Sequence, residues 1–257
     1  MRRLATLALL LIVTGALAAA ARAEVVQSGG VRVTFHAEFA PHALPRERPA
    51  PISVEVDGKI STTDGTQPPP LQSLRVELSS SGKIDTEGLP ACRAAQLQTT
   101  SSELALQRCG RAQVGRGKFQ AELTFTGRPT LVDGRALVFN GIVDGRQGMF
   151  IHIYISRPVN LTLVIPVKIS RGSGRFGTVL TTRVPQLAGG FGSITQLSLK
   201  IGRQYSYAGA RHSYLSAACT APEGFPGATF TFAKAVFGFD HIHPMTAFIS
   251  RSCQVRN

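Results

Sequence analysis

Hydrophobic and polar residues alternate along much of the chain. In the segment 31–39 every second residue is Val, Phe or Ala, and the residues between them are Arg, Thr, His and Glu. A period of two predicts a β-strand with one buried face. The Asp-Gly pairs at 133–134 and 144–145 predict hairpin turns, and Pro166 predicts a sheet edge or a bulge. Similar runs predict further strands over 52–60, 74–78, 149–155, 161–169, 176–184, 194–201, 205–214, 229–237 and 246–250.

One segment departs from this pattern. Residues 90–109 are rich in Ala, Leu and Gln, and the sequence Thr-Ser-Ser-Glu at 100–103 has the spacing of a helix capping box. We therefore expect two short helices, over about 92–98 and 101–109, that fold back on each other.

The four cysteines, Cys92, Cys109, Cys219 and Cys253, are an even number, as in disulfide-bonded exported proteins. Three pairings are possible. We expect Cys92–Cys109 and Cys219–Cys253, because each pair brackets a compact stretch of sequence. The alternative is a four-cysteine metal site, but such a site needs close Cys-x-x-Cys pairs, and the sequence has none.

These elements together predict an all-β protein. The chain of 257 residues is 43% hydrophobic, which excludes a disordered tail, and it has 26 glycines, far fewer than a collagen would carry. About ten regularly spaced strands indicate an antiparallel β-sandwich, with the disulfide-stapled helical hairpin as an insert at about 90–110. The strands continue at the same spacing through residue 145, so we expect one domain over 24–257.

The first 23 residues have the features of a secretory signal peptide. Arg2 and Arg3 precede a nearly unbroken apolar run, which ends in an Ala-Arg-Ala cleavage pattern at 21–23. We expect the mature protein to begin at Glu24 and to be secreted or otherwise extracytoplasmic, with no membrane span after signal cleavage. An uncleaved anchor is the alternative, but the small residues before the cleavage pattern favour cleavage.

The formal net charge is +13, and the excess lies in the second half of the chain. Residues 24–144 include 13 basic and 13 acidic side chains, whereas residues 145–257 include 12 basic and 2 acidic side chains. This asymmetry predicts an anionic partner outside the cell, such as a cell-envelope or extracellular polymer, and no intracellular nucleic acid.

Basic and aromatic residues gather in one part of that half. Two tyrosines on one strand face, edged by cations, would form a flat surface for a sugar acid, a phosphate polymer or nucleic acid. The alternative is an outer strand whose tyrosines cover the sheet, and the absence of Trp weakens a sugar-stacking platform. The candidate ligand-binding residues are Lys200, Arg203, Tyr205, Tyr207 and Arg211.

Asp240, His241 and His243 form a weak candidate for a metal site. Histidines at i and i+2 of a strand point the same way, and a nearby Asp could complete three ligands. However, the segment lies between two predicted strands, where Asp, His and Pro are ordinary loop residues. We therefore expect no metal and no cofactor.

No catalytic residue can be assigned from the sequence. It has no Gly-x-Ser-x-Gly motif, and its glycine-rich segments have no phosphate-loop lysine. Only Glu223 and Asp240 are acidic after residue 144, so paired carboxylates for glycosidase chemistry would come from the first half.

Several short segments resemble a group of uncharacterised secreted proteins from GC-rich soil bacteria. The resemblance would cover most of the mature chain and implies a secreted, disulfide-bonded β-protein without implying an activity. The segments are Gly88-Leu-Pro-Ala-Cys92, Cys109-Gly110, Val114-Gly-Arg-Gly117, Phe176-Gly-Thr-Val-Leu180, Ser213-Tyr-Leu-Ser216 before Cys219, and Arg251-Ser-Cys253.

We expect a secreted, non-enzymatic binding or structural module that contacts anionic polymer through its basic C-terminal half. The alternative is a secreted polysaccharide hydrolase, with carboxylates from the first half or a metal at His241 and His243. A third interpretation is a purely structural or adhesive surface protein, which salt-sensitive binding would distinguish from the first.

Overall fold

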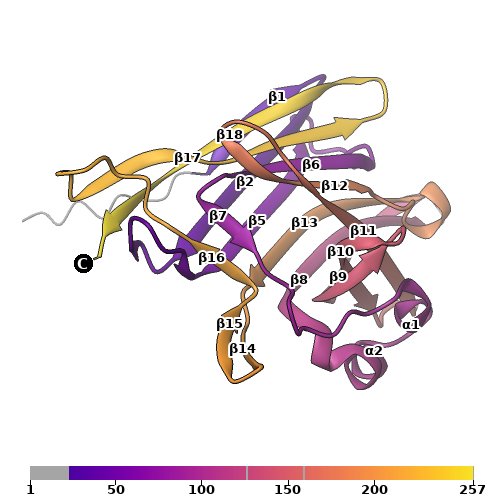
Figure 1. Ribbon diagram of the computed structural model, residues 1–257. Helices are drawn as coiled ribbons and strands as arrows, with labels where there is room; N and C mark the ends of the chain where they lie inside the picture. Colours follow the sequence, from indigo (N-terminus) through magenta and orange to yellow (C-terminus); the bar gives the residue numbers. More distant parts are fainter. Residues whose placement is uncertain (1–22, 126, 159, 257) are drawn as a thin grey trace, which may run out of the picture.

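The computed structural model describes residues 23–125, 127–158 and 160–256, so the predicted signal peptide lies outside this range apart from Ala23. Within the described residues thirteen strands form one strongly curled sheet (Figure 1). In their order across the sheet, the strands are β1 (Glu24–Ser28), β2 (Val31–Ala40), β5 (Ser53–Thr62), β13 (Gly192–Ile201), β8 (Gln113–Phe125), β9 (Arg128–Val143), β10 (Arg146–Ile155), β11 (Leu161–Arg171), β12 (Phe176–Arg183), β6 (Leu71–Ser79), β17 (Gly227–Phe239), β18 (Ile242–Val255) and β3 (Ala43–Leu44).

The two halves of the chain interleave in this sheet. Strand β13 lies between β5 and β8, and β6 lies between β12 and β17. The all-β prediction is confirmed, but the two-sheet sandwich of about ten strands is not. An alternating pattern shows that one face of a strand is buried, and a sheet that curls on itself buries that face without a second sheet.

Two smaller sheets and two short helices complete the fold. The hairpin of β14 and β15 projects from the body of the molecule (Figure 1). No helix in the described ranges is long and apolar enough to cross a membrane. The remaining elements are β4 (Ala50–Pro51), β16 (Leu215–Ala217) and β7 (Gly82–Ile84) in one small sheet, β14 (Gln204–Tyr207) and β15 (Ala210–Ser213) in the other, α1 (Ala94–Leu97), α2 (Ser102–Cys109), and the 3-10 turns η1 (Gly110–Ala112) and η2 (Ala188–Gly190).

Most predicted strands coincide with observed ones, and two local predictions are wrong. The segment 205–214 is a hairpin rather than one strand, because Ala208 and Gly209 form its turn at φ values of 49° and 77°. The Asp-Gly pair at 133–134 lies inside β9, whereas the pair at 144–145 makes the predicted turn between β9 and β10. Pro166 predicted a sheet edge or a bulge; it pairs with Phe150 of β10 without a bulge, but on its other side it has no partner in β12, whose pairing with β11 begins at Lys168.

The sequence did not predict β8, which contains Gly115 and Gly117. Glycine is rare in strands, because it has no side chain to pack. Here its small size is required, since a Cβ atom at Gly117 would collide with the backbone carbonyl of Ser198 on β13. The glycine therefore marks a close approach of two neighbouring strands.

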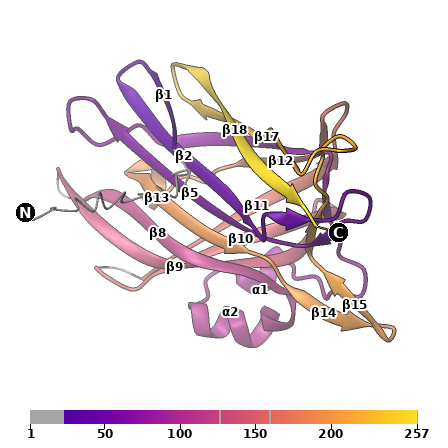
Figure 2. The same cartoon turned by 90° about the vertical axis from the view of Figure 1, so that its left-hand side faces the viewer.

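The predicted helical hairpin and both predicted disulfides are confirmed. Cys92–Cys109 and Cys219–Cys253 have Cα–Cα distances of 5.7 and 5.6 Å. The cap of α2 is shifted by one residue from the expected box, because Ser101 accepts the Leu104 N–H at 3.3 Å. The two helices pack on the outer face of β9 and β10 (Figure 2), where Leu137 and Phe139 are fully buried.

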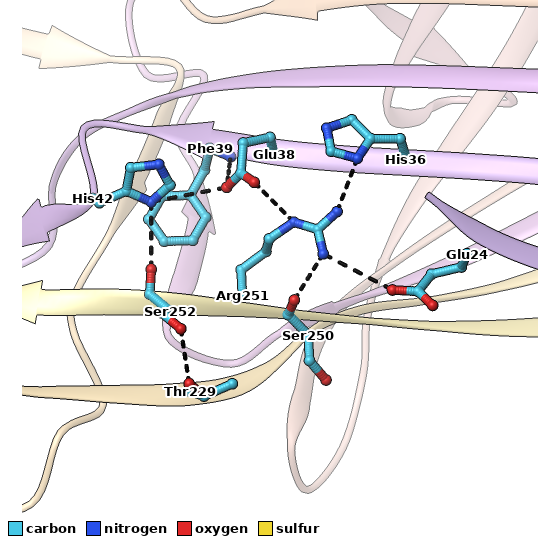
Figure 3. Close-up of polar contacts among 9 residues, drawn as sticks. All are labelled: Glu24, His36, Glu38, Phe39, His42, Thr229, Ser250, Arg251 and Ser252. Carbon is cyan, nitrogen blue, oxygen red and sulfur yellow. Dashed lines mark hydrogen bonds and ion pairs between the residues drawn. The ribbon is translucent and has the colours of Figure 1, made fainter. Parts of the chain in front are cut away.

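The two ends of the sheet meet at a charged contact on Arg251 (Figure 3). Strands β1 and β18 lie side by side, although no strand pairing joins them in the described part of the chain. Arg251 of β18 has 8% of its side chain exposed, and its Nε lies 3.0 Å from Glu38 Oε2 on β2. Its Nη2 donates to His36 Nδ1 at 3.1 Å, and its Nη1 is 3.9 Å from Glu24 Oε1 on β1. Removing Glu38 would take the nearest counter-charge from a buried guanidinium, so this contact stabilises the packing of β18 against β1 and β2.

Candidate ligand-binding cavity

The concave face of the curled sheet encloses a cavity of about 220 Å³. Strands β7 and β16 of the small sheet cover one side of it. Eight strands of the large sheet line it: β2, β5, β6, β10, β11, β12, β13 and β17. An apolar cavity of about 150 Å³ can hold a molecule of the size of benzene. The space inside this sheet is therefore large enough for a small apolar group.

The lining is apolar but incompletely packed. Val56 on β5, Val76 on β6, Leu180 on β12 and Leu197 on β13 all point into the cavity, yet each remains only partly buried. In a filled core such side chains would be buried on all sides, since protein interiors are close-packed. Their remaining exposure faces the cavity, so they offer unfilled apolar surface.

The lining carries few groups that could perform chemistry. Among the described residues that line the cavity there is no carboxylate, imidazole or thiol, and Lys83 is the one charged residue. Its other polar side chains are hydroxyls, among them Thr178 and Ser216. This composition is typical of a binding cavity with a few orienting polar groups.

A second, polar pocket of about 540 Å³ adjoins the first. The two share five lining residues, which lie on β7, beside it and on β12: Ser81, Gly82, Lys83, Ile84 and Thr178. The polar pocket adds Arg171 from the end of β11 and Gln147 from β10. The apolar cavity and the polar pocket therefore lie on either side of the same segment of chain.

The structure uses several of the predicted ligand-binding residues for internal contacts. Lys200 Nζ lies 2.6 Å from Glu55 Oε1 on the neighbouring strand. Arg203 Nη1 donates to the backbone carbonyls of Arg111 and Gln113 at 2.7 and 2.8 Å. Arg211 is exposed on β15.

The two predicted tyrosines hold the β14–β15 hairpin against residues 85–88. Tyr205 stacks on His212 at 5.5 Å and donates its hydroxyl to the Glu87 carbonyl at 2.8 Å. The ring of Tyr207 lies against Gly88, where there is no room for a Cβ atom. Burial, followed by the nearby Asp85 and Glu87 carboxylates, raises the pKa of Tyr205, so its hydroxyl stays a donor. Both rings contact His212, so they share one face, as expected, but that face covers the protein's own chain.

The weak metal candidate lies at an exposed turn. Asp240 and His241 form the turn between β17 and β18, with His241 Nε2 3.3 Å from Asp240 Oδ2, and His243 is exposed. Within the described ranges, the group with a ligand set close enough to hold a metal is a different one, Asp85, Glu87 and His212. Sequence reasoning missed this group, because the loop after β7 and the separate β14–β15 hairpin bring it together, and Glu87 is exposed.

The charge asymmetry along the chain is partly neutralised in space. Because the halves interleave, four cations of the second half pair with carboxylates of the first. These pairs are Lys168–Asp144, Lys200–Glu55, Lys234–Glu77 and Arg251–Glu38.

No family model, no curated protein and no solved structure matches the chain. The resemblance to secreted proteins of soil bacteria therefore stays a prediction. The cavity itself was missed in the sequence, because a residue that lines a cavity and one that fills a core have the same place in an alternating pattern.

Proposed function

We propose that the protein is an exported, non-enzymatic binding module that takes an apolar ligand into the cavity of its curled sheet. The observation that carries this proposal is the set of inward-facing apolar side chains that stay partly buried. Covering apolar surface contributes about 25 cal/mol per Å², so an apolar ligand would gain free energy by filling this space. The two disulfides agree with export, because such bonds persist in oxidising compartments.

The two other predicted functions have less support. Four of the five residues proposed to bind an anionic polymer, Lys200, Arg203, Tyr205 and Tyr207, already make contacts within the protein. A hydrolase would need paired carboxylates at its substrate site, and none lines the cavity among the described residues. The hydrolase hypothesis would be supported if the protein cleaved a polysaccharide and a single Asp or Glu substitution abolished that activity.

The test is binding of N-phenyl-1-naphthylamine, an uncharged fluorescent probe, to the mature, oxidised protein. We expect saturable fluorescence enhancement, which Leu180→Trp reduces by filling the cavity. Thr181→Trp is the matched control, because Thr181 has the opposite orientation on the same strand. The chain has no native Trp, so the fluorescence of the introduced Trp in each variant also reports whether that side chain is buried. Enhancement that is absent, or equally weakened by both variants, contradicts the proposal.

A further inference from the structure

Strand β11 presents an arginine on the face that elsewhere lines the cavity. Ile165 and Val167 point into the apolar cavity, and Ile169 and Arg171 follow at the same two-residue spacing and line the polar pocket. Arg171 is also the cross-strand partner of Thr178, which lines both spaces. The inward face of β11 thus changes from apolar to cationic at its end.

A second cation lies at the same place. Lys83 on β7 lines both the apolar cavity and the polar pocket. The pocket contains no carboxylate among its described residues, and in that part of the chain neither Lys83 nor Arg171 forms an ion pair. Hydroxyls of Ser80, Ser81 and Ser170 supply further possible donors around it.

Two other cations of the large sheet have carboxylate partners. Arg251 occupies an inward position of β18, like Met245 and Ile249, and it contacts Glu38 and Glu24. Lys168, three residues before Arg171 on β11, lies 2.6 Å from Asp144. Arg251 is buried and paired with carboxylates, whereas Lys83 and Arg171 are exposed at the polar pocket and have no carboxylate partner within the described residues.

We infer that the ligand is an amphiphile with an anionic oxygen headgroup, whose chain enters the cavity and whose headgroup contacts Lys83 and Arg171. This inference rests on the proposed function and adds the polarity of the ligand and its direction in the site. Arginine and lysine both bind carboxylates and phosphates, and the guanidinium group can do so through two parallel hydrogen bonds. A long-chain carboxylate and an alkyl phosphate share this chemistry.

The test measures displacement of N-phenyl-1-naphthylamine from the mature, oxidised protein by compounds with one chain and different headgroups. These are dodecanoate, dodecyl phosphate, dodecanol and dodecyltrimethylammonium, each below the concentration at which it aggregates. We expect the two anions to bind at least about tenfold more tightly than the alcohol, and the cation to bind most weakly. The stronger of the two anions identifies the headgroup as carboxylate or phosphate.

Lys83→Gln and Arg171→Gln should each weaken binding of the preferred anion about fivefold, the scale of an exposed ion pair, and leave dodecanol unchanged. Lys168→Gln is the control, because it removes one cation from the outer face of the same strand. If all four compounds bind equally well and the variants change nothing, the headgroup inference is wrong while the cavity still binds. If the probe itself does not bind, the proposed function fails and this inference fails with it.

Discussion

The outer face of β9 and β10 and the concave face of the sheet are both apolar, but they are packed differently. Under the helical hairpin, Leu97, Ala105 and Leu137 are fully buried and form a closed layer with the Cys92–Cys109 disulfide. On the concave face, side chains such as Val76 and Leu180 remain partly buried around a cavity.

The difference follows from what covers each face. The outer face is covered by a segment of the chain itself, which is too short to be stable alone and is held by a disulfide. The concave face depends on the curvature of a thirteen-stranded sheet, and the side chains that it brings inward do not fill the space. The first region is a core, whereas the second has the properties of a binding site.

The largest expected effect is on the free energy of unfolding, when one Leu→Ala substitution is made on each face. Leu137→Ala should lower the free energy of unfolding by about 3.5 kcal/mol, because it creates a hole in a closed layer. Leu180→Ala should lower it by only about 1 kcal/mol, since its side chain is partly buried and already borders an empty space. Urea unfolding followed by circular dichroism measures both. Equal losses would show that the concave face is packed as tightly as the outer one.

The two disulfides provide a second contrast. Cys92→Ser with Cys109→Ser should destabilise the protein by about 3 kcal/mol, the value for a loop of this length. Probe binding should persist at temperatures where this variant stays folded, because the hairpin covers the opposite face of the sheet.

Cys219→Ser with Cys253→Ser is the matched comparison. This bond ties the chain after β16, which covers one side of the cavity, to β18. We therefore expect weaker probe binding in the second variant and unchanged probe binding in the first. The reverse result would place the ligand under the helices.

The smallest expected effect is a pH dependence confined to the hairpin layer. Burial lowers the pKa of His152, whose Nε2 lies 3.0 Å from the Thr100 hydroxyl between the helices. Because the pKa is depressed in the folded state, the unfolded chain binds the proton more readily. Stability should therefore be complete above about pH 6.5 and fall as the pH decreases below it.

Thermal unfolding at pH 7.5 and pH 5.5 tests this, with His152→Gln expected to reduce the difference between the two pH values. His243→Gln is the control, since His243 is exposed on β18. If His243→Gln removed the stability difference between the two pH values and His152→Gln did not, the pH dependence would arise at His243 and the prediction would be wrong.

Local patterns predicted most of the elements but few of their partners. Alternation in 31–39 identified β2, and the composition of 90–109 identified the hairpin and its disulfide. Strand β8 was missed because glycine lowers strand propensity, although Gly117 is there to let β13 approach. The candidate residues on β14 were chosen for their types, but the contacts that Tyr205 and Tyr207 make with 85–88 are not visible in any local spacing.

The sequence by itself determined the β-rich class and the helical hairpin, because each depends on residues close together or on simple periodicity, and among three possible cysteine pairings it favoured the one that the structure has. Only the tertiary structure decided that the strands form one curled sheet, that its interior is incompletely filled, and that Lys83 and Arg171 line one pocket in which no described residue is a carboxylate. Strand order and sheet curvature arise from pairings between distant segments. The alternating pattern shows which face of the strand a side chain is on, but it does not show whether another side chain or an empty space lies opposite that face.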